Sequence, residues 1–90
     1  MASNFQVSFK QSRERLNLSW CGDFDGSSAF EIINTLSEHG QNFNQVFIDT
    51  EYLDTIYPFG KHVFLKNFRI LCKTINQLIF TGKHKQEFAN

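Results

Sequence analysis

The amino-acid sequence predicts an α/β fold in which helices pack on a mixed β-sheet. Apolar and polar residues alternate near the N-terminus, which is typical of half-buried strands, and two later stretches show the periodicity of amphipathic helices. A short apolar run is found near "QVFID" and another at "QLIF". The predicted order is therefore β-β-α-β-α-β with a short final helix, and we interpret residues 1–90 as a single domain.

The first two strands are expected to form a hairpin. Period-two alternation places every second side chain on the same face of a strand. The connection "QSRE" is polar and of hairpin length, although it lacks the glycine that a tight two-residue turn prefers. The apolar residues that alternate in this way are Phe5, Val7, Phe9, Leu16, Leu18 and Trp20.

A first helix is predicted over residues 28–39. The preceding segment "CGDFDGSS" contains two glycines and two aspartates and interrupts the strand pattern, so we expect a loop there. Ser28 and Glu31 have the spacing of a capping box, and Gly40 is expected to end the helix in a left-handed conformation. The apolar face of this helix carries Ala29, Ile32, Ile33 and Leu36.

The run of Val46, Phe47 and Ile48 predicts a central strand that is covered on both faces, because it is apolar throughout and does not alternate. The segment "TEYLDTIYP" bridges to a second helix, and Pro58 suits its first turn. A strand at 77–80 follows this helix, so the connection fits a crossover between parallel strands. The last segment, "KHKQEFA", is expected to begin a short helix.

The second helix is predicted to be amphipathic, with a basic face opposite its apolar stripe. Cys72 lies on the stripe and is therefore expected in the core, where it would not act as a nucleophile. The stripe comprises Phe64, Phe68, Leu71, Cys72 and Ile75. The basic face comprises His62, Lys66, Arg69 and Lys73.

Charge is unevenly distributed along the chain, although the formal net charge is zero. Residues 16–60 contain seven acids and no Lys or Arg, whereas residues 61–85 contain six Lys or Arg residues and no acid. Separated patches of opposite sign can steer a partner during association. Two ordinary solvated faces would give the same pattern, so both interpretations stay open.

No pattern typical of catalysis, a metal site or a cofactor site is found. His39, His62 and His84 are scattered, and Cys21 and Cys72 form no CxxC pair, so we expect neither a metal site nor a disulfide. The chain also lacks a phosphate-binding glycine pattern. We therefore predict a protein that is not an enzyme and that binds no cofactor.

Asp23 and Asp25 have a spacing that is also seen in calcium loops, but the remaining ligands of an EF-hand are absent. We interpret the pair as turn-forming residues that complement the positive end of the first helix. Nucleic-acid binding is not expected, because the sequence pI is ≈ 6.8 and the acids would repel a polyanion. No apolar segment approaches the ~20 residues that span a bilayer, so we expect a cytoplasmic protein without membrane insertion.

The order of elements and two motifs resemble the STAS domain, a family that includes anti-sigma factor antagonists and the STAS subunits of lipid transporters. Gly22-Asp23-Phe24-Asp25 is similar to the family's glycine–polar–leucine–aspartate motif before the first helix. The segment 46–49 is similar to its buried strand ending in Asp or Asn, and Leu53 to a leucine or valine that follows. The resemblance covers roughly residues 5–82 and implies a SpoIIAA-like mixed sheet.

The turn before the second helix departs from the family pattern. Tyr57, Pro58, Phe59 and Gly60 fall on its four turn positions, and only Gly60 agrees. The family's phosphorylatable Ser or Thr falls on Pro58 or Phe59, so phosphorylation is not expected at this turn. A gapped match to Asp54-Thr55 would leave Pro58 inside the helix, at a cost of ~3 kcal/mol. Candidate modification sites elsewhere are Ser27, Ser28 and Thr55.

The resemblance implies a regulatory module that docks on a protein partner, an anti-sigma factor or kinase-like protein, through the second helix and the turn before it. Aromatic and basic side chains at an exposed turn are also what an interface anchor requires. For Phe59, a place in the core is the alternative. The expected partner-binding residues are Tyr57, Pro58, Phe59, Gly60, Lys61, His62, Lys66, Arg69 and Lys73.

Two alternative functions and the possibility of a homodimer stay open at this point. The chain could be a STAS subunit that stabilises a transporter ATPase. It could also be a nucleotide or anion sensor, because the N-terminus of the second helix would favour an anion. Exposed edge strands would allow a homodimer, although nothing in the sequence selects it.

Overall fold

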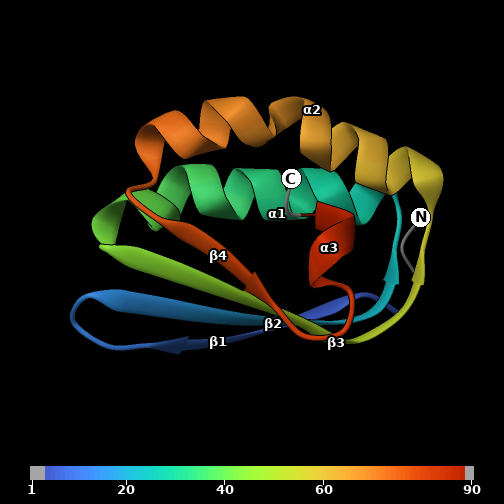
Figure 1. Cartoon of the computed structure of the whole chain (residues 1–90), viewed down its shortest axis with the longest axis horizontal. Helices are drawn as coiled ribbons and strands as arrows, with labels where there is room; N and C mark the ends of the chain where they lie inside the picture. Colours follow the sequence, from blue (N-terminus) through green and yellow to red (C-terminus); the bar gives the residue numbers. More distant parts are fainter. Residues whose placement is uncertain (1–3, 89–90) are drawn as a thin grey trace.

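The computed structural model describes residues 4–88, which form one sheet with helices packed on it (Figure 1). The strands are β1 (Gln6–Gln11), β2 (Arg15–Phe24), β3 (Gln45–Ile56) and β4 (Leu78–Thr81). The helices are α1 (Gly26–His39), α2 (Pro58–Thr74) and α3 (Lys85–Phe88), and a 3₁₀ turn follows α1 at Gly40–Asn42. The predicted order of elements is confirmed.

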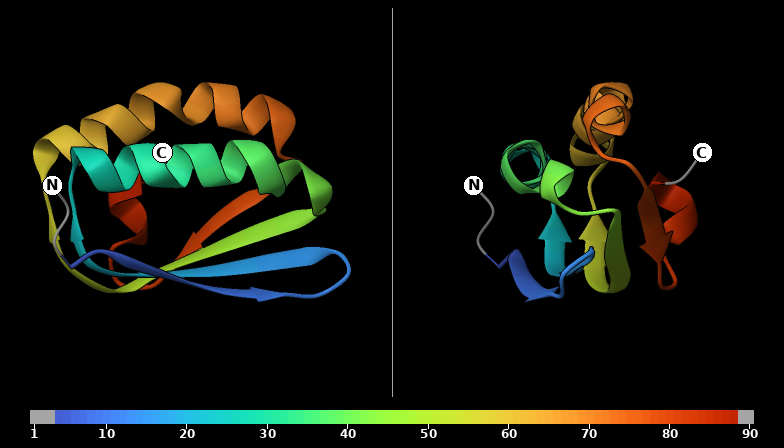
Figure 2. Two further views of the ribbon diagram at one scale, coloured as in Figure 1. Left: turned by 180° about the vertical axis from the view of Figure 1, so that it is seen from behind. Right: turned by 90° about the vertical axis from the view of Figure 1, so that its left-hand side faces the viewer.

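The sheet has the strand order β1-β2-β3-β4. β1 is antiparallel to β2, whereas β2, β3 and β4 are parallel to one another. The crossover that was predicted between the last two strands is therefore confirmed. Helices α1 and α2 lie on the same face of the sheet, and α3 lies beside β4 (Figure 2).

β2 and β3 both continue beyond their predicted ends. The segment expected as a loop after Trp20 stays in β2, and most of the expected bridge before Pro58 stays in β3. The two strands keep pairing in this region, from Cys21 with Tyr52 to Phe24 with Ile56, although the register shifts twice. Gly22 has a φ of +92°, a left-handed value that a side chain would strain, so it accommodates the irregular pairing.

Helix α1 starts two residues earlier than predicted because its N-cap is Asp25, so the predicted capping box at Ser28 is wrong. Gly40 is right-handed (φ −61°, ψ −33°) and opens the 3₁₀ turn, so the predicted left-handed end is also wrong. Gly40 is needed for packing instead: a Cβ there would lie 2.8 Å from the Ile75 side chain. α2 begins at Pro58, as predicted.

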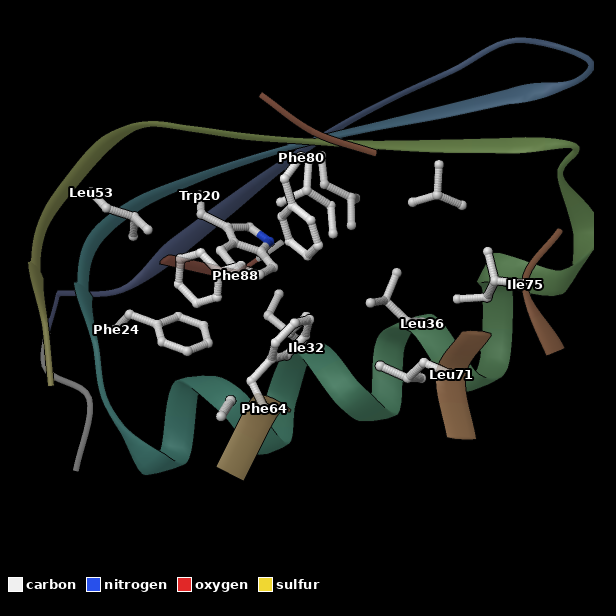
Figure 3. Close-up of a cluster of buried hydrophobic side chains, with 14 of the residues drawn as sticks. Trp20, Phe24, Ile32, Leu36, Leu53, Phe64, Leu71, Ile75, Phe80 and Phe88 are labelled. Carbon is white, nitrogen blue, oxygen red and sulfur yellow. The ribbon is translucent and has the colours of Figure 1, made fainter. Parts of the chain in front are cut away.

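The core is aromatic and lies between the sheet and the helices (Figure 3). Trp20 is fully buried and stacks on Phe24, with ring centroids 5.0 Å apart. Phe64 of α2 and Phe88 of α3 approach the same indole edge-on, at 5.7 Å and 5.2 Å. The indole Nε1 has no hydrogen-bond partner among residues 4–88.

In the part of the chain that the structure describes, helices cover only one face of the sheet, so the prediction of a strand buried on both faces is wrong. Val46 and Ile48 are fully buried under the helices, but Phe47 points to the other face and is only half-buried. There the Arg15 guanidinium lies 4.9 Å above the Phe47 ring, a cation–π contact that partly replaces a covering layer.

The prediction for Cys72 is also wrong: this residue is exposed. It lies at the margin of the apolar stripe of α2, whose buried side chains include Phe64 and Leu71. Each helical residue turns by about 100°, so Cys72 points well away from Leu71. Local desolvation nevertheless raises the pKa of the Cys72 thiol, which keeps it protonated and weakly reactive.

Candidate docking surface

The turn before α2 joins the ends of two strands to the start of the helix. The backbone N–H of Tyr57 donates to the carbonyl of Phe24 at the end of β2, at 2.9 Å. Pro58 then occupies the first helical position, and the N–H of Lys61 donates to the carbonyl of Tyr57 at 3.0 Å. These bonds fix the turn and leave its side chains outside the core.

The aromatic side chains of this turn face solvent. Tyr57 is 46% exposed and Phe59 is 65% exposed. The core position that remained open for Phe59 is therefore excluded. Burying such a ring stabilises a protein by roughly 1.5–3 kcal/mol, so the exposed ring is apolar surface that a contact could cover.

Gly60 is buried and holds the start of α2 against the start of α1. A Cβ at Gly60 would lie 2.6 Å from the Asp25 carbonyl carbon, so only glycine permits this approach. The Phe59 ring in turn covers Gly26, where a Cβ would lie 2.7 Å from the ring. The end of the Gly22-Asp23-Phe24-Asp25 motif and the turn before α2, which are more than thirty residues apart in sequence, therefore meet in space.

Asp25 acts as the N-cap of α1. Its Oδ1 accepts a hydrogen bond from the backbone N–H of Ser28 at 2.9 Å and another from the Ser28 hydroxyl at 3.0 Å. The bond from the Ser28 N–H stabilises the carboxylate and lowers the pKa of Asp25 below its ordinary value of 3.8. The predicted role of Asp25 at the positive end of a helix is thus seen.

Gly22 and Asp23, near the end of β2, make backbone contacts next to the start of α1. The N–H of Asp23 donates to the Asn4 side chain at 3.2 Å, and its carbonyl lies 3.2 Å from the Ser28 hydroxyl. Gly22 packs against the backbone of Asn4, where a Cβ would come within 2.1 Å of the carbonyl oxygen. These contacts are structural.

The predicted basic face lies on the solvent side of α2. His62, Lys66, Arg69 and Lys73 are all exposed. Lys61 differs, because its Nζ lies 2.8 Å from Glu87 Oε1 in α3. The hydrogen bond and the charge of Lys61 lower the pKa of Glu87. Lys61 therefore contacts α3, whereas His62, Lys66, Arg69 and Lys73 remain exposed on α2.

An open groove of about 540 Å³ runs between α1 and α2 beside this basic face. Three apolar residues on its borders are exposed: Phe30 by 54%, Phe59 by 65% and Ile70 by 62%. His62 and Lys66 line the same groove. We call this surface the docking groove; its residues are Phe30, Phe59, His62, Val63, Lys66, Asn67 and Ile70.

Phe30 and Ile70 were missed by the sequence reasoning. Each falls outside the apolar stripe of its own helix, Phe30 opposite Ile32 and Ile70 away from Phe64. A large apolar residue on the polar face of an amphipathic helix was the available signal. That the two residues border one groove depends on how α1 packs against α2.

The candidate modification sites differ in access. Ser27 and Thr55 are exposed, but Ser28 is fully buried and hydrogen-bonded to Asp25. Within residues 4–88, no three His, Cys, Asp or Glu side chains gather in a way that could hold a metal ion. None of the helices in that range is long and apolar enough to cross a membrane.

Comparison with known proteins identifies the fold through structure alone. The sequence matches no protein-family model and no curated protein. The structure is similar to the anti-sigma factor antagonist SpoIIAA in its unphosphorylated form, with a TM-score of 0.63 and 19% identity over 86% of this chain and 71% of SpoIIAA. The chain has a SpoIIAA-like, STAS-type fold. The resemblance found in the sequence is therefore confirmed at the level of the fold.

The structure is also similar to a second antagonist and to part of a larger protein. An anti-sigma factor antagonist from Mycobacterium paratuberculosis has a TM-score of 0.65 and 12% identity, over 92% of this chain and 73% of its own. Mglu in its L-glutamate binding form has a TM-score of 0.78 and 10% identity, over 93% of this chain. This chain spans only 28% of the length of Mglu.

Proposed function

We propose that this SpoIIAA-like domain is a non-catalytic, cytoplasmic regulatory module that docks on a protein partner through α2 and the turn before it. The observation that carries the proposal is the exposed ring of Phe59, held at a rigid turn beside the docking groove. An aromatic side chain next to an apolar groove is typical of an interface anchor, because a partner can desolvate it fully.

The partner surface that fits the groove is acidic around an apolar centre. α2 contains no acid from Pro58 to Thr74, Lys66 lines the groove, and Arg69 lies on the same exposed face of the helix. An apolar side chain of the partner would lie between Phe30, Phe59 and Ile70, and its carboxylates would face Lys66 and Arg69. Because SpoIIAA and the mycobacterial protein are anti-sigma factor antagonists, we propose an anti-sigma factor or kinase-like protein as the partner, with a transporter ATPase as the alternative.

Docking at this turn would not be controlled by phosphorylation of a Ser or Thr in the turn, as the family resemblance would otherwise imply. The two positions that match the phosphorylatable residue hold Pro58 and Phe59, which have no hydroxyl group. Control would therefore come from concentration, from competition between partners or from another domain.

The test is a pull-down from native cell extract with four baits. They are the wild type, Phe59→Ala, Lys66→Glu/Arg69→Glu, and the matched control Lys83→Glu/Lys85→Glu, which makes the same change in charge near α3. We expect a partner that binds the wild type and the control but is lost from the first two variants. A partner retained by all four baits would place the interface elsewhere.

An anion or nucleotide sensor at the N-terminus of α2 is less well supported. No phosphate-binding glycine pattern leads into α2, and the N–H of Lys61 in its first turn already donates to the Tyr57 carbonyl. Thermal unfolding with ATP, GTP or inorganic phosphate separates the two functions, because a bound ligand raises the Tm according to its affinity. The docking proposal expects no shift.

A further inference from the structure

Within residues 4–88, β1 forms a sheet edge on which no further strand is paired. All its residues except the half-buried Val7 are exposed, and Phe9 is 60% exposed. Its pairing with β2 is regular from Gln6 to Gln11, without the proline or bulge that often blocks further pairing. The opposite edge, β4, has only four residues and lies beside α3 (Figure 2).

The outward backbone groups of β1 can be assigned from its hairpin with β2. Ser12 continues the register of the pair, and its N–H donates to the carbonyl of Arg15 at 2.9 Å. Hydrogen-bonded residues alternate along an antiparallel strand, so Ser8 and Lys10 also bond to β2. The N–H and C=O groups of Val7 and Phe9 therefore point away from the sheet.

We propose that β1 pairs antiparallel with β1 of a second copy of this chain, with the two-fold axis at Ser8. Val7 of each copy then lies opposite Phe9 of the other, and the outward groups of these residues bond to each other. Residues that lie opposite each other in an antiparallel pair have their side chains on the same face of the sheet. The exposed Phe9 ring would therefore contact Val7 of the second copy.

The charge pattern of β1 suits a second copy. Lys10 is the only charged residue in β1, and the two-fold axis places it opposite the uncharged Gln6 of the second copy. Like charges therefore do not face each other across the pair. Because so short an edge buries less than the roughly 1,200 Å² of a standard interface, we expect a weak dimer that dissociates on dilution.

The second-copy contact does not depend on the proposed function. It uses the free edge of β1, whereas the docking groove lies between α1 and α2. The dimer is tested by self-association of the pure chain, whereas docking is tested by capture of another protein. Failure of one proposal would therefore leave the other intact.

The test places like charges on the two-fold axis. Ser8 is exposed, so Ser8→Lys and Ser8→Glu should fold normally, which thermal unfolding checks. By sedimentation equilibrium over a range of concentrations, we expect a monomer–dimer equilibrium for the wild type and for the control Ser37→Lys, which adds the same charge on α1. For each Ser8 variant alone, the dimer dissociation constant should rise at least about tenfold. An equimolar mixture of the two variants should dimerise again.

Three outcomes would overturn the proposal. The wild type could stay monomeric at every concentration. The Ser8 variants could dimerise as well as the wild type. Alternatively, the mixed variants could fail to recover the dimer, which would mean that Ser8 does not face its counterpart.

Discussion

At the scale of single residues, the best-defined part of the molecule is the contact between the starts of α1 and α2. The Asp25 side chain caps α1, and the Asp25 backbone packs closely against Gly60 of α2. The residue therefore sets both the first helix and the position of the turn that presents Phe59. Its carboxylate and its backbone serve separate purposes, and substitutions can test them separately.

Replacing Asp25 tests the capping role. Asp25→Ala removes the acceptor for the Ser28 N–H and should lower the free energy of unfolding by about 1 kcal/mol at neutral pH. Asp25→Asn is the matched control, because its amide oxygen still caps the helix, and it should lose less. Urea denaturation followed by circular dichroism measures both variants, and equal losses would argue against a capping hydrogen bond.

The capping contribution of Asp25 should also depend on pH. The pKa of Asp25 is lower in the folded state than its ordinary value of 3.8, so its stabilisation is fully present above that value. It is lost as the pH falls through the lower folded pKa, because the neutral carboxyl accepts the hydrogen bond of the Ser28 N–H more weakly than the carboxylate does. The difference between wild type and Asp25→Asn should therefore shrink below pH about 4 and stay constant above it.

At the scale of elements, the kind and order of the helices and strands could be predicted from the sequence, but their ends could not. Gly22 and Asp23 are residue types that strands disfavour, so local pattern reads them as a loop. They stay in β2 because β3 pairs with them, and a partner strand thirty residues away leaves no local signal. The preference of proline for the first helical turn placed the start of α2 at Pro58, and periodicity placed Phe64 and Leu71 on its buried side, although it wrongly included Cys72.

The short helix α3 contributes more to the fold than its four residues suggest. Phe88 is fully buried, and its ring lies within 5.7 Å of the centroids of Trp20, Phe24, Phe64 and Phe80. The loop before it is attached to β3 through His84, whose ring Nε2 lies 3.2 Å from the Leu53 carbonyl. α3 thus closes one side of the aromatic core.

Truncation of this side chain should therefore be costly. Phe88→Ala is expected to lower the free energy of unfolding by about 3–5 kcal/mol, and the Tm by more than about 12 °C. Glu87→Gln, which breaks only the exposed pair with Lys61, should cost less than about 1 kcal/mol. Thermal and urea denaturation compare the two, and a Phe88→Ala variant within 1 kcal/mol of the wild type would mean that α3 does not complete the core.

At the scale of the whole molecule, only one part of the candidate site, the basic face of α2, could be predicted from the sequence. The basic face could be predicted because His62, Lys66 and Arg69 share one side of a single helix. The docking groove could not, because Phe30 comes from α1 and borders it only after α1 and α2 have packed together. Lys61 could not be separated from its neighbours either, since its partner Glu87 belongs to α3.

The basic side chains and the exposed Phe59 ring are expected to affect different rate constants of docking. With the captured partner in surface plasmon resonance, Lys66→Glu/Arg69→Glu should mainly slow association and weaken its salt dependence, because exposed charges act on encounter over about 10 Å. Phe59→Ala should instead speed dissociation at least about fivefold, because the ring acts only after contact. If Phe59→Ala slowed association alone, the ring would not be buried in the complex, and the groove would serve to steer the partner without anchoring it.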